Sequence, residues 1–264
     1  MTHLGYHGAL GLSQVDYKIT DRYADTAATA RWQLEANLPI DVCVLPLRRV
    51  APSAEAGLTR AALGLPEGAV VFGAFVGVLK LSQRCVGAWR RTLEAVPGSL
   101  LAFSPPRDED RRAIERRLSG LGIAAARLVF IPFRRGDDAF NRARYGVIDI
   151  ALDTMPYTGG DTTAAALDAG VPVVTRVGGR HAERMGYSIL MHLGLTQTIA
   201  QTDDAYVELA VRLARDRAFR DDAGAAVVRA VGDPAVIDPV RYARALEAAF
   251  DRALSASAAP DETR

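Results

Sequence analysis

Residues 158–163 read Thr-Gly-Gly-Asp-Thr-Thr, a set of residue types that can hold an anion. Paired glycines let the backbone approach a ligand closely, and hydroxyls at the start of a helix can join free N–H groups in binding a diphosphate. The alternative is an ordinary helix start with Asp161 or Thr162 as the N-cap. Because a carboxylate repels phosphate, we expect the Asp161 side chain to cap the helix, to face away or to contact a sugar hydroxyl.

A second candidate is Lys80, which closely follows an apolar run that ends at Val76. An ammonium group at this place can neutralise a phosphate bound at the edge of a sheet. The alternative, a solvated surface lysine, is the more common situation. The argument against it is that the chain has only one other lysine, Lys18, and otherwise uses arginine.

Three histidines are weaker candidates. His181 lies beside Arg180 and near Arg184, either of which could meet an anion. Spacing assigns no carboxylate partner to His181, so a role as general base is disfavoured. His3 and His7 stand in a glycine-rich opening segment and are better placed for a loop that faces a ligand.

The elements that must position these residues alternate along the chain. Short apolar runs predict strands at 69–76, 100–104, 128–132, 148–153 and 171–175, and amphipathic segments predict helices at 84–95, 108–121, 137–145, 162–169 and 180–193. Runs that are apolar throughout are typical of strands buried on both faces, so the pattern predicts an α/β fold with a parallel, doubly wound sheet. In such sheets ligands bind beyond the carboxyl ends of the strands, where the candidate residues stand.

The two ends of the chain follow other patterns. Residues 206–215, 219–231 and 241–254 predict helices only, and the polar tail 255–264 is expected to fray. Near the start, residues 15–20 predict one strand and residues 46–57 a linker. One strand and a helix cannot form a core of their own, so we expect the first fifty residues to pack on the rest of the protein or on a partner.

Composition narrows the classes of function. Lysine and arginine total 32 against 31 acidic residues, so nothing favours nucleic-acid binding. Cys43 and Cys85 form no CxxC pair, which argues against a disulfide framework or a structural zinc and for a reducing, cytoplasmic location. No apolar run approaches the ~20 residues of a membrane span, so we expect no membrane insertion. Walker A, GxSxG, HExxH and GxGxxG motifs are also missing from the sequence.

Taken in order, these segments resemble the SPINDLY-like O-linked N-acetylglucosaminyltransferases. Residues 4–8 (LGYHG) and 15–21 (VDYKITD) are similar to the family's LGYPG and MDY-I-TD elements. Residues 75–80 resemble its phosphate-lysine strand. The stretch 148–175, with GGDTT and GVPVVT, matches its most recognisable part, and 182–195 continues the match. The resemblance extends to about residue 250.

This resemblance implies a Rossmann-like α/β lobe, the C-terminal lobe of a GT-B glycosyltransferase. It implies a UDP-sugar donor, typically UDP-N-acetylglucosamine, transfer to Ser or Thr of protein acceptors with inversion at the anomeric carbon, and neither a metal ion nor another cofactor. By position it assigns Lys80 to the departing diphosphate. It assigns donor binding to Phe133, Arg134, Arg135 and Asn141 near the uracil and to Gly160, Asp161, Thr162 and Thr163 at the diphosphate.

The sequence also departs from the family pattern. The family's glutamine before the lysine falls at Gly77, its uracil-side histidine near Asn141, and the acidic residue that holds the ribose at Ala165. Asp161 or Asp168 would have to take over the ribose contact. We therefore expect weakened affinity for the donor.

The match begins at the end of the family's N-terminal catalytic lobe. We accordingly divide the chain into a remnant of that lobe with the connection (1–50), the nucleotide-sugar lobe (51–254) and a flexible tail (255–264). Transfer would then need an acceptor-side lobe, supplied by a separate chain in one hypothesis. The alternatives are a non-catalytic UDP-sugar-binding or partner module from a truncated or degenerate transferase and, last, a sugar-nucleotide epimerase, which needs two complete lobes as well.

Overall fold

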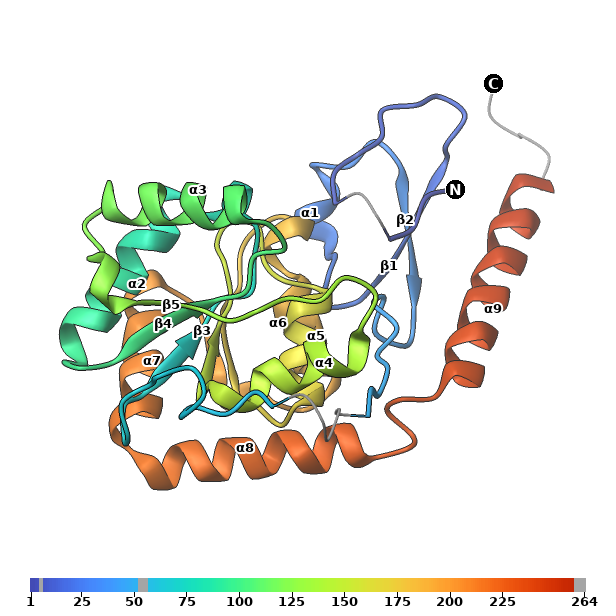
Figure 1. Ribbon diagram of the computed structural model, residues 1–264. Helices are drawn as coiled ribbons and strands as arrows, with labels where there is room; N and C mark the ends of the chain where they lie inside the picture. Colours follow the sequence, from blue (N-terminus) through green and yellow to red (C-terminus); the bar gives the residue numbers. More distant parts are fainter. Residues whose placement is uncertain (5–6, 52–56, 259–264) are drawn as a thin grey trace.

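A six-stranded, wholly parallel sheet lies at the centre of the molecule (Figure 1). The computed structural model describes residues 1–4, 7–51 and 57–258. The strand order is β5-β4-β3-β6-β7-β8, with β3 Val71–Gly73, β4 Leu100–Phe103, β5 Leu128–Phe130, β6 Ile150–Leu152, β7 Val173–Arg176 and β8 Ile199–Ala200. The predicted doubly wound sheet is confirmed, although the strands are shorter than predicted and β8 was missed.

Successive residues of each strand enter two separate apolar cores. In β3, Val71 belongs to one core and the buried Phe72 to the other. Helices α2 (Gln83–Ala95), α3 (Asp108–Ser119) and α7 (Asp203–Arg215) cover the Phe72 side, while α5 (Asp161–Asp168) and α6 (Met185–His192) cover the Val71 side. This two-sided burial explains why the strand sequences are apolar throughout.

Two further helices complete the covering of the sheet. The short α4 (Asp138–Ala143) lies beside α5, and α8 (Arg217–Gly232) contacts both α5 and α7 (Figure 1). The predicted helix at 180–193 is wrong in one respect, since the structure has a 3-10 turn, η4 (His181–Glu183), followed by α6. Arg184 interrupts the helix because its φ of −129° is not helical.

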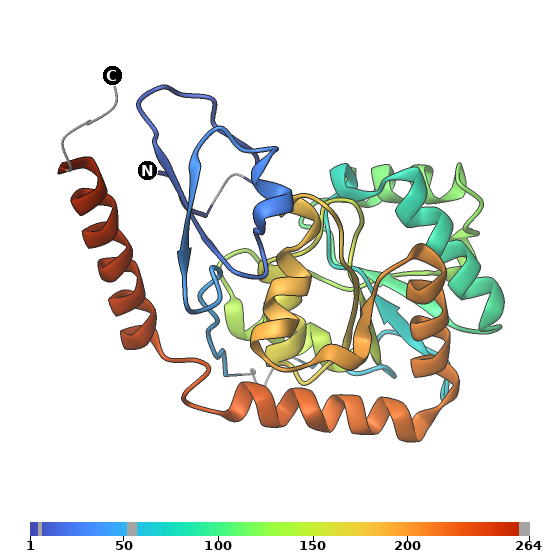
Figure 2. The same ribbon diagram turned by 180° about the vertical axis from the view of Figure 1, so that it is seen from behind.

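A small second unit stands at one end of the molecule. Its strands β1 (Tyr17–Asp21) and β2 (Ala36–Ile40) pair in parallel, with α1 (Ala27–Ala30) between them in the chain. The sequence prediction missed β2, which contains Pro39, a residue that sheets tolerate only at edges or strand ends. The last helix, α9 (Pro239–Ala258), returns to pack against β2, as both views show (Figures 1 and 2).

Polar contacts join this unit to α6 and to the residue before it. The carboxylate of Asp21 accepts hydrogen bonds from the Ser188 hydroxyl of α6 at 2.6 Å and from the backbone N–H of Val44 at 2.8 Å. Nε of Arg184 donates to the carbonyl oxygen of Tyr23. The first strands are thereby fixed against α6. The proposed domain division at residue 50 stays a prediction.

Candidate functional site

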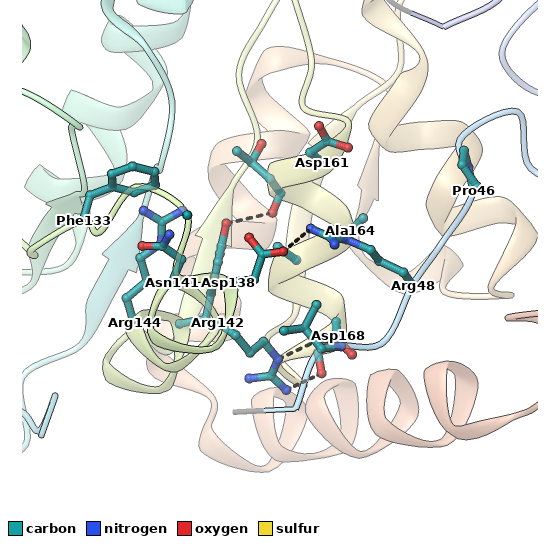
Figure 3. Close-up of a pocket in the computed structure, with 15 residues that line it drawn as sticks. Pro46, Arg48, Phe133, Asp138, Asn141, Arg142, Arg144, Asp161, Ala164 and Asp168 are labelled. Atoms are coloured by element: carbon teal, nitrogen blue, oxygen red, sulfur yellow. Dashed lines mark hydrogen bonds and ion pairs between the residues drawn. The ribbon is translucent and has the colours of Figure 1, made fainter. Parts of the chain in front are cut away.

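A cavity of about 600 Å³ opens beside the N-terminus of α5. Its walls come from four segments: the chain after β2, the loop after β5, the α4 region and α5 itself. Figure 3 shows Phe133 and Arg144 on one side of the space and Arg48 on the other. Of the residues predicted to bind the donor, Phe133, Asn141, Asp161 and Thr162 line this cavity.

The helix α5 starts without a side-chain cap. Its N-cap is Gly160, and neither prediction of Asp161 or Thr162 as N-cap is correct, because Asp161 is already the first helical residue. The exposed Asp161 side chain and the partly exposed Thr162 stand at the cavity, while Thr163 is buried and lines a small void beneath it. The first N–H groups of a helix have no partner inside the helix, so this end can receive an anion.

Asp153 lies beneath the loop that precedes α5. One of its carboxylate oxygens accepts hydrogen bonds from the backbone N–H of Gly159 at 2.6 Å and of Thr154 at 2.8 Å; the other accepts from the Thr175 hydroxyl at 2.7 Å. Burial raises the pKa of Asp153 to about 6, although these hydrogen bonds favour the ionised form. A side chain at Gly186 would collide with this carboxylate, so a glycine is needed there.

Lys80 ends a 3-10 turn, η1 (Val78–Lys80), on the side of the same loop. Its Nζ donates a 2.8 Å hydrogen bond to the carbonyl oxygen of Thr158 and lies 4.0 Å from the centre of the Tyr157 ring. Burial lowers the pKa of Lys80, and the charges of Asp153 and Asp161 oppose this shift. The lysine thus contacts the loop that leads into α5 and is not among the residues that line the cavity.

Arg144 is a cavity residue that the sequence prediction missed. Its buried guanidinium donates to the Ser104 hydroxyl at 2.9 Å and lies 5.0 Å from the rings of Phe75 and Phe133. Within the described part of the chain no carboxylate pairs with it and its Nε has no hydrogen-bond partner. Burial lowers its pKa. A buried guanidinium without a carboxylate partner is costly unless oxygen atoms satisfy its remaining N–H groups, so Arg144 is a candidate contact for a ligand in this cavity.

The other residues predicted near the uracil differ in position. Asn141 bridges the backbone of Arg134, accepting from its N–H at 3.1 Å and donating to its carbonyl oxygen at 2.6 Å. Arg134 and Arg135 are both exposed and are not among the cavity-lining residues. Arg134 instead packs on the Phe140 ring at 3.9 Å. The structure therefore brings Phe133 and Asn141 to the cavity but leaves the two arginines outside.

Comparisons with known proteins identify the family of this chain. Residues 50–246 match the family described as glycosyl transferase family 41. The chain belongs to this family. The resemblance to SPINDLY-like transferases is confirmed by the probable UDP-N-acetylglucosamine–peptide N-acetylglucosaminyltransferase SPINDLY of Arabidopsis thaliana, 36% identical over 219 residues that cover 82% of this chain and 24% of the relative. Its Hordeum vulgare counterpart is 32% identical over 253 residues, 95% of this chain and 26% of the relative.

Solved structures agree about the fold of this family 41 chain. A mutant of the Thermobaculum terrenum O-GlcNAc transferase aligns with a TM-score of 0.80 and 27% identity over 95% of this chain and 47% of that one. The Rossmann-like lobe of a GT-B glycosyltransferase is thus confirmed as the fold. The chain spans about a quarter of the length of the curated relatives it matches. Within its described residues no helix is long and apolar enough to cross a membrane.

Histidines of the family 41 chain gather at the other side of the loop that carries Tyr157. Nδ1 of the buried His181 lies 2.6 Å from the carboxylate of Asp25, the partner that spacing could not reveal. The His7 ring lies 5.1 Å from the Tyr157 ring and 5.5 Å from that of His181. His3 is elsewhere, hydrogen-bonded to the Tyr242 hydroxyl at 3.1 Å.

The charges around Asp25 keep its carboxylate ionised. Burial would raise the pKa of Asp25, but the hydrogen bond and charge of His181, with the Thr20 hydroxyl and Lys18, lower it to about 2. Lys18 itself is fully buried, with Nζ 3.9 Å from the Asp25 carboxylate. The opening segment and the lobe therefore share one charged cluster at this edge of the site.

Proposed function

We propose that this chain binds UDP-N-acetylglucosamine and forms the donor half of an enzyme that transfers N-acetylglucosamine, with inversion, to Ser or Thr of protein acceptors. The observation that carries the proposal is the cavity itself. It joins an aromatic and guanidinium wall, Phe133 and Arg144, to the uncapped N-terminus of α5. A nucleoside diphosphate needs both features, one for its base and one for its phosphates.

The base of the donor is placed against Phe133 and Arg144 in this proposal. A uracil presents carbonyl oxygens, which can accept hydrogen bonds from the Arg144 guanidinium, whose Nε has no partner among the described residues, and its flat face can stack on an aromatic ring. Asn141, at the same wall, adds an edge of the site. Arg134 and Arg135 retain only a long-range electrostatic role because both are exposed.

The ribose lies along α5 in this arrangement, beside Ala164 and Ala165. Asp168 is a poor substitute for the family's acidic residue. Its carboxylate already accepts hydrogen bonds from Nε of Arg49 at 2.7 Å and Nε of Arg142 at 2.8 Å. Asp161 is exposed and is the carboxylate that remains for a sugar or ribose hydroxyl.

The diphosphate is assigned to Gly160, Thr162 and Thr163 at the start of α5, with Lys80 across the loop. As the anomeric C–O bond breaks, negative charge grows on the diphosphate. Fixed N–H groups and an ammonium then stabilise the transition state more than the ground state. Lys80 reaches the ligand by exchanging its hydrogen bond to the Thr158 carbonyl for a phosphate oxygen.

Transfer also requires a surface that holds the acceptor. The chain covers 47% of the aligned O-GlcNAc transferase chain, so we place the acceptor-binding half outside these 264 residues, with a separate chain as one source. We further propose a cytoplasmic location, since both cysteines, Cys43 and Cys85, are free and buried.

Calorimetric titration tests the donor site directly. UDP and UDP-N-acetylglucosamine should bind saturably and more tightly than ADP or GDP. Lys80→Ala should weaken binding of both uridine nucleotides at least roughly tenfold, the expected loss for one charge-assisted hydrogen bond. Arg116→Ala, on the exposed face of α3, is the matched control and should bind like the unsubstituted chain. A folded chain that binds no uridine nucleotide would contradict the proposal.

A further inference from the structure

His7 lies where the opening segment of the chain meets the loop proposed to hold the diphosphate. Its imidazole makes an edge contact with the Tyr157 ring, and Nζ of Lys80 lies over the same tyrosine ring at 4.0 Å. The Tyr157 ring therefore contacts both His7 and the lysine assigned to the leaving group. On its other side His7 faces the His181 ring.

Among the described residues, none engages the imidazole nitrogens of His7. No described residue forms a hydrogen bond with either nitrogen, and the side chain is partly exposed. His181 and the more distant His3 differ, because His181 is hydrogen-bonded to Asp25 and His3 to Tyr242. His7 is thus the described histidine beside the loop whose nitrogens are both unengaged and reachable.

The surroundings of His7 keep it neutral. Burial and then the positive charges of His181, Lys80 and Lys18 lower the pKa of His7 to about 4. Asp25, the acidic group behind His181, is committed to that histidine and to Lys18. At neutral pH His7 is therefore a neutral imidazole. One of its two nitrogens has a lone pair that can accept a proton.

We propose that His7 is the acceptor-side base of this site, receiving the proton of the hydroxyl that attacks the donor sugar. This inference rests on the proposed function. The hydroxyl oxygen forms a bond to the anomeric carbon while the bond from that carbon to the diphosphate oxygen breaks. The electron pair of the broken bond leaves with UDP, and the hydroxyl proton passes to an imidazole nitrogen of His7.

Binding of the donor strengthens this base. A diphosphate beside Lys80 offsets one of the positive charges that hold the pKa of His7 down, so that pKa rises when the site is filled. At the separations of these rings the expected rise is about one unit.

The inference is tested by nuclear magnetic resonance of the ¹⁵N-histidine-labelled full chain, titrated with pH in the absence and presence of saturating UDP. The pKa of His7 should rise by about one unit with UDP, while that of His3 serves as the internal control and stays constant. In Lys80→Ala the pKa of His7 should already be higher without UDP. UDP binding without movement of the His7 pKa would overturn this inference alone, whereas absence of UDP binding would overturn the proposed function as well.

A rate measurement separates a base from a packing residue. His7→Phe keeps a ring against Tyr157 and His181 but has no nitrogen, and should lower the release of N-acetylglucosamine from UDP-N-acetylglucosamine to water by roughly 100-fold. UDP affinity should stay within about twofold of the unsubstituted chain, because His7 does not hold the diphosphate. The control is His3→Phe, expected to leave the rate unchanged. Equal rates for His7→Phe and the unsubstituted chain would refute a role as base.

Discussion

The carboxylate of Asp168 accepts a 2.8 Å hydrogen bond from Nε of Arg142, so the last turn of α5 is tied to α4 across the floor of the cavity (Figure 3). The same carboxylate accepts from Nε of Arg49 at 2.7 Å and from the backbone N–H of Val50 at 3.1 Å. Three segments that are distant in sequence therefore meet at one buried acid. This arrangement sets the width of the proposed ribose site.

Replacing Asp168 with asparagine should destabilise the protein. Asparagine is neutral and keeps only one of the two oxygens that accept from Arg49 and Arg142, so Arg142, which is largely buried, loses its counter-ion. We expect the free energy of unfolding to fall by about 2–4 kcal/mol, below the loss for a fully buried pair because Arg49 is half exposed. Urea unfolding measures the change, and Asp138→Asn, at an exposed ion pair with Arg48, is the control with an expected loss under about 1 kcal/mol. Equal losses of unfolding free energy in the two variants would contradict the role of Asp168 in joining α4, α5 and residues 49–50.

Arg144→Met should separate binding from stability. Methionine fills the space among Phe75, Phe133 and Tyr145 without an uncompensated charge, so the thermal midpoint should stay the same or rise. UDP affinity should fall roughly tenfold to a hundredfold, because the donor to the base is lost. Calorimetry and thermal unfolding of the same sample give both quantities. A variant that is destabilised yet binds UDP normally would show that Arg144 is structural.

Asp153 makes stability depend on pH in an identifiable window. Its folded pKa of about 6 lies above its ordinary value of 3.8, so the folded state holds the proton more tightly than the unfolded chain. This proton stabilises the folded state by on the order of 3 kcal/mol below pH ~4. The stabilisation is lost as the pH rises through 6.

Asp153→Asn removes this dependence. We compare the free energy of unfolding of this variant with that of the unsubstituted protein. As the pH rises from 4.5 to 7.5, the difference should shift in favour of the variant by roughly 2–3 kcal/mol. The low pKa of His7 acts in the opposite direction in the same window, but both proteins share it, so it cancels in the difference. Urea unfolding at the two pH values is the measurement. A difference that stays constant with pH would contradict the raised pKa of Asp153.

Two glycine-to-alanine substitutions should change the free energy of unfolding in opposite directions. At Gly186 a new methyl group would press on Asp153 and Thr175, so we expect a loss of about 1–3 kcal/mol in unfolding free energy and weaker UDP binding through the displaced loop. At Gly87, inside α2, a methyl group meets no atom within 4 Å, and alanine should stabilise by about 0.5–1 kcal/mol. Thermal unfolding of the pair checks the prediction. Two shifts of the same sign would be inconsistent with this packing.

Strong local patterns made most of the fold predictable. The runs around Phe72, Leu101 and Val174 are apolar because each strand is buried on both faces, and such patterns survive any tertiary context. The strand β2 was missed because only Leu38 and Ile40 are buried in it and Pro39 interrupts it. The break before α6 was missed because it depends on the backbone angle of one residue, Arg184.

The site residues that come directly after a strand could be predicted from the sequence. Those that only the tertiary fold brings to the site could not. Thr162 and Phe133 come directly after strands, so topology alone placed them near a ligand. Arg144 stands in a segment with several other arginines, and nothing local marks it as the buried one. The pairing of Asp25 with His181 joins residues 156 positions apart, which periodicity cannot detect.

The packing of α9 on β2 bears on how the protein is made. Ribosomal synthesis delivers residues 17–40 well before residues 239–258, yet α9 packs against β2 (Figure 2). The strands β1 and β2 therefore stay uncovered on one side until about 200 further residues have been synthesised. At typical speeds of about 5–20 residues per second this interval lasts roughly 10–40 s, during which an unfinished strand edge is open to mispairing or to chaperones.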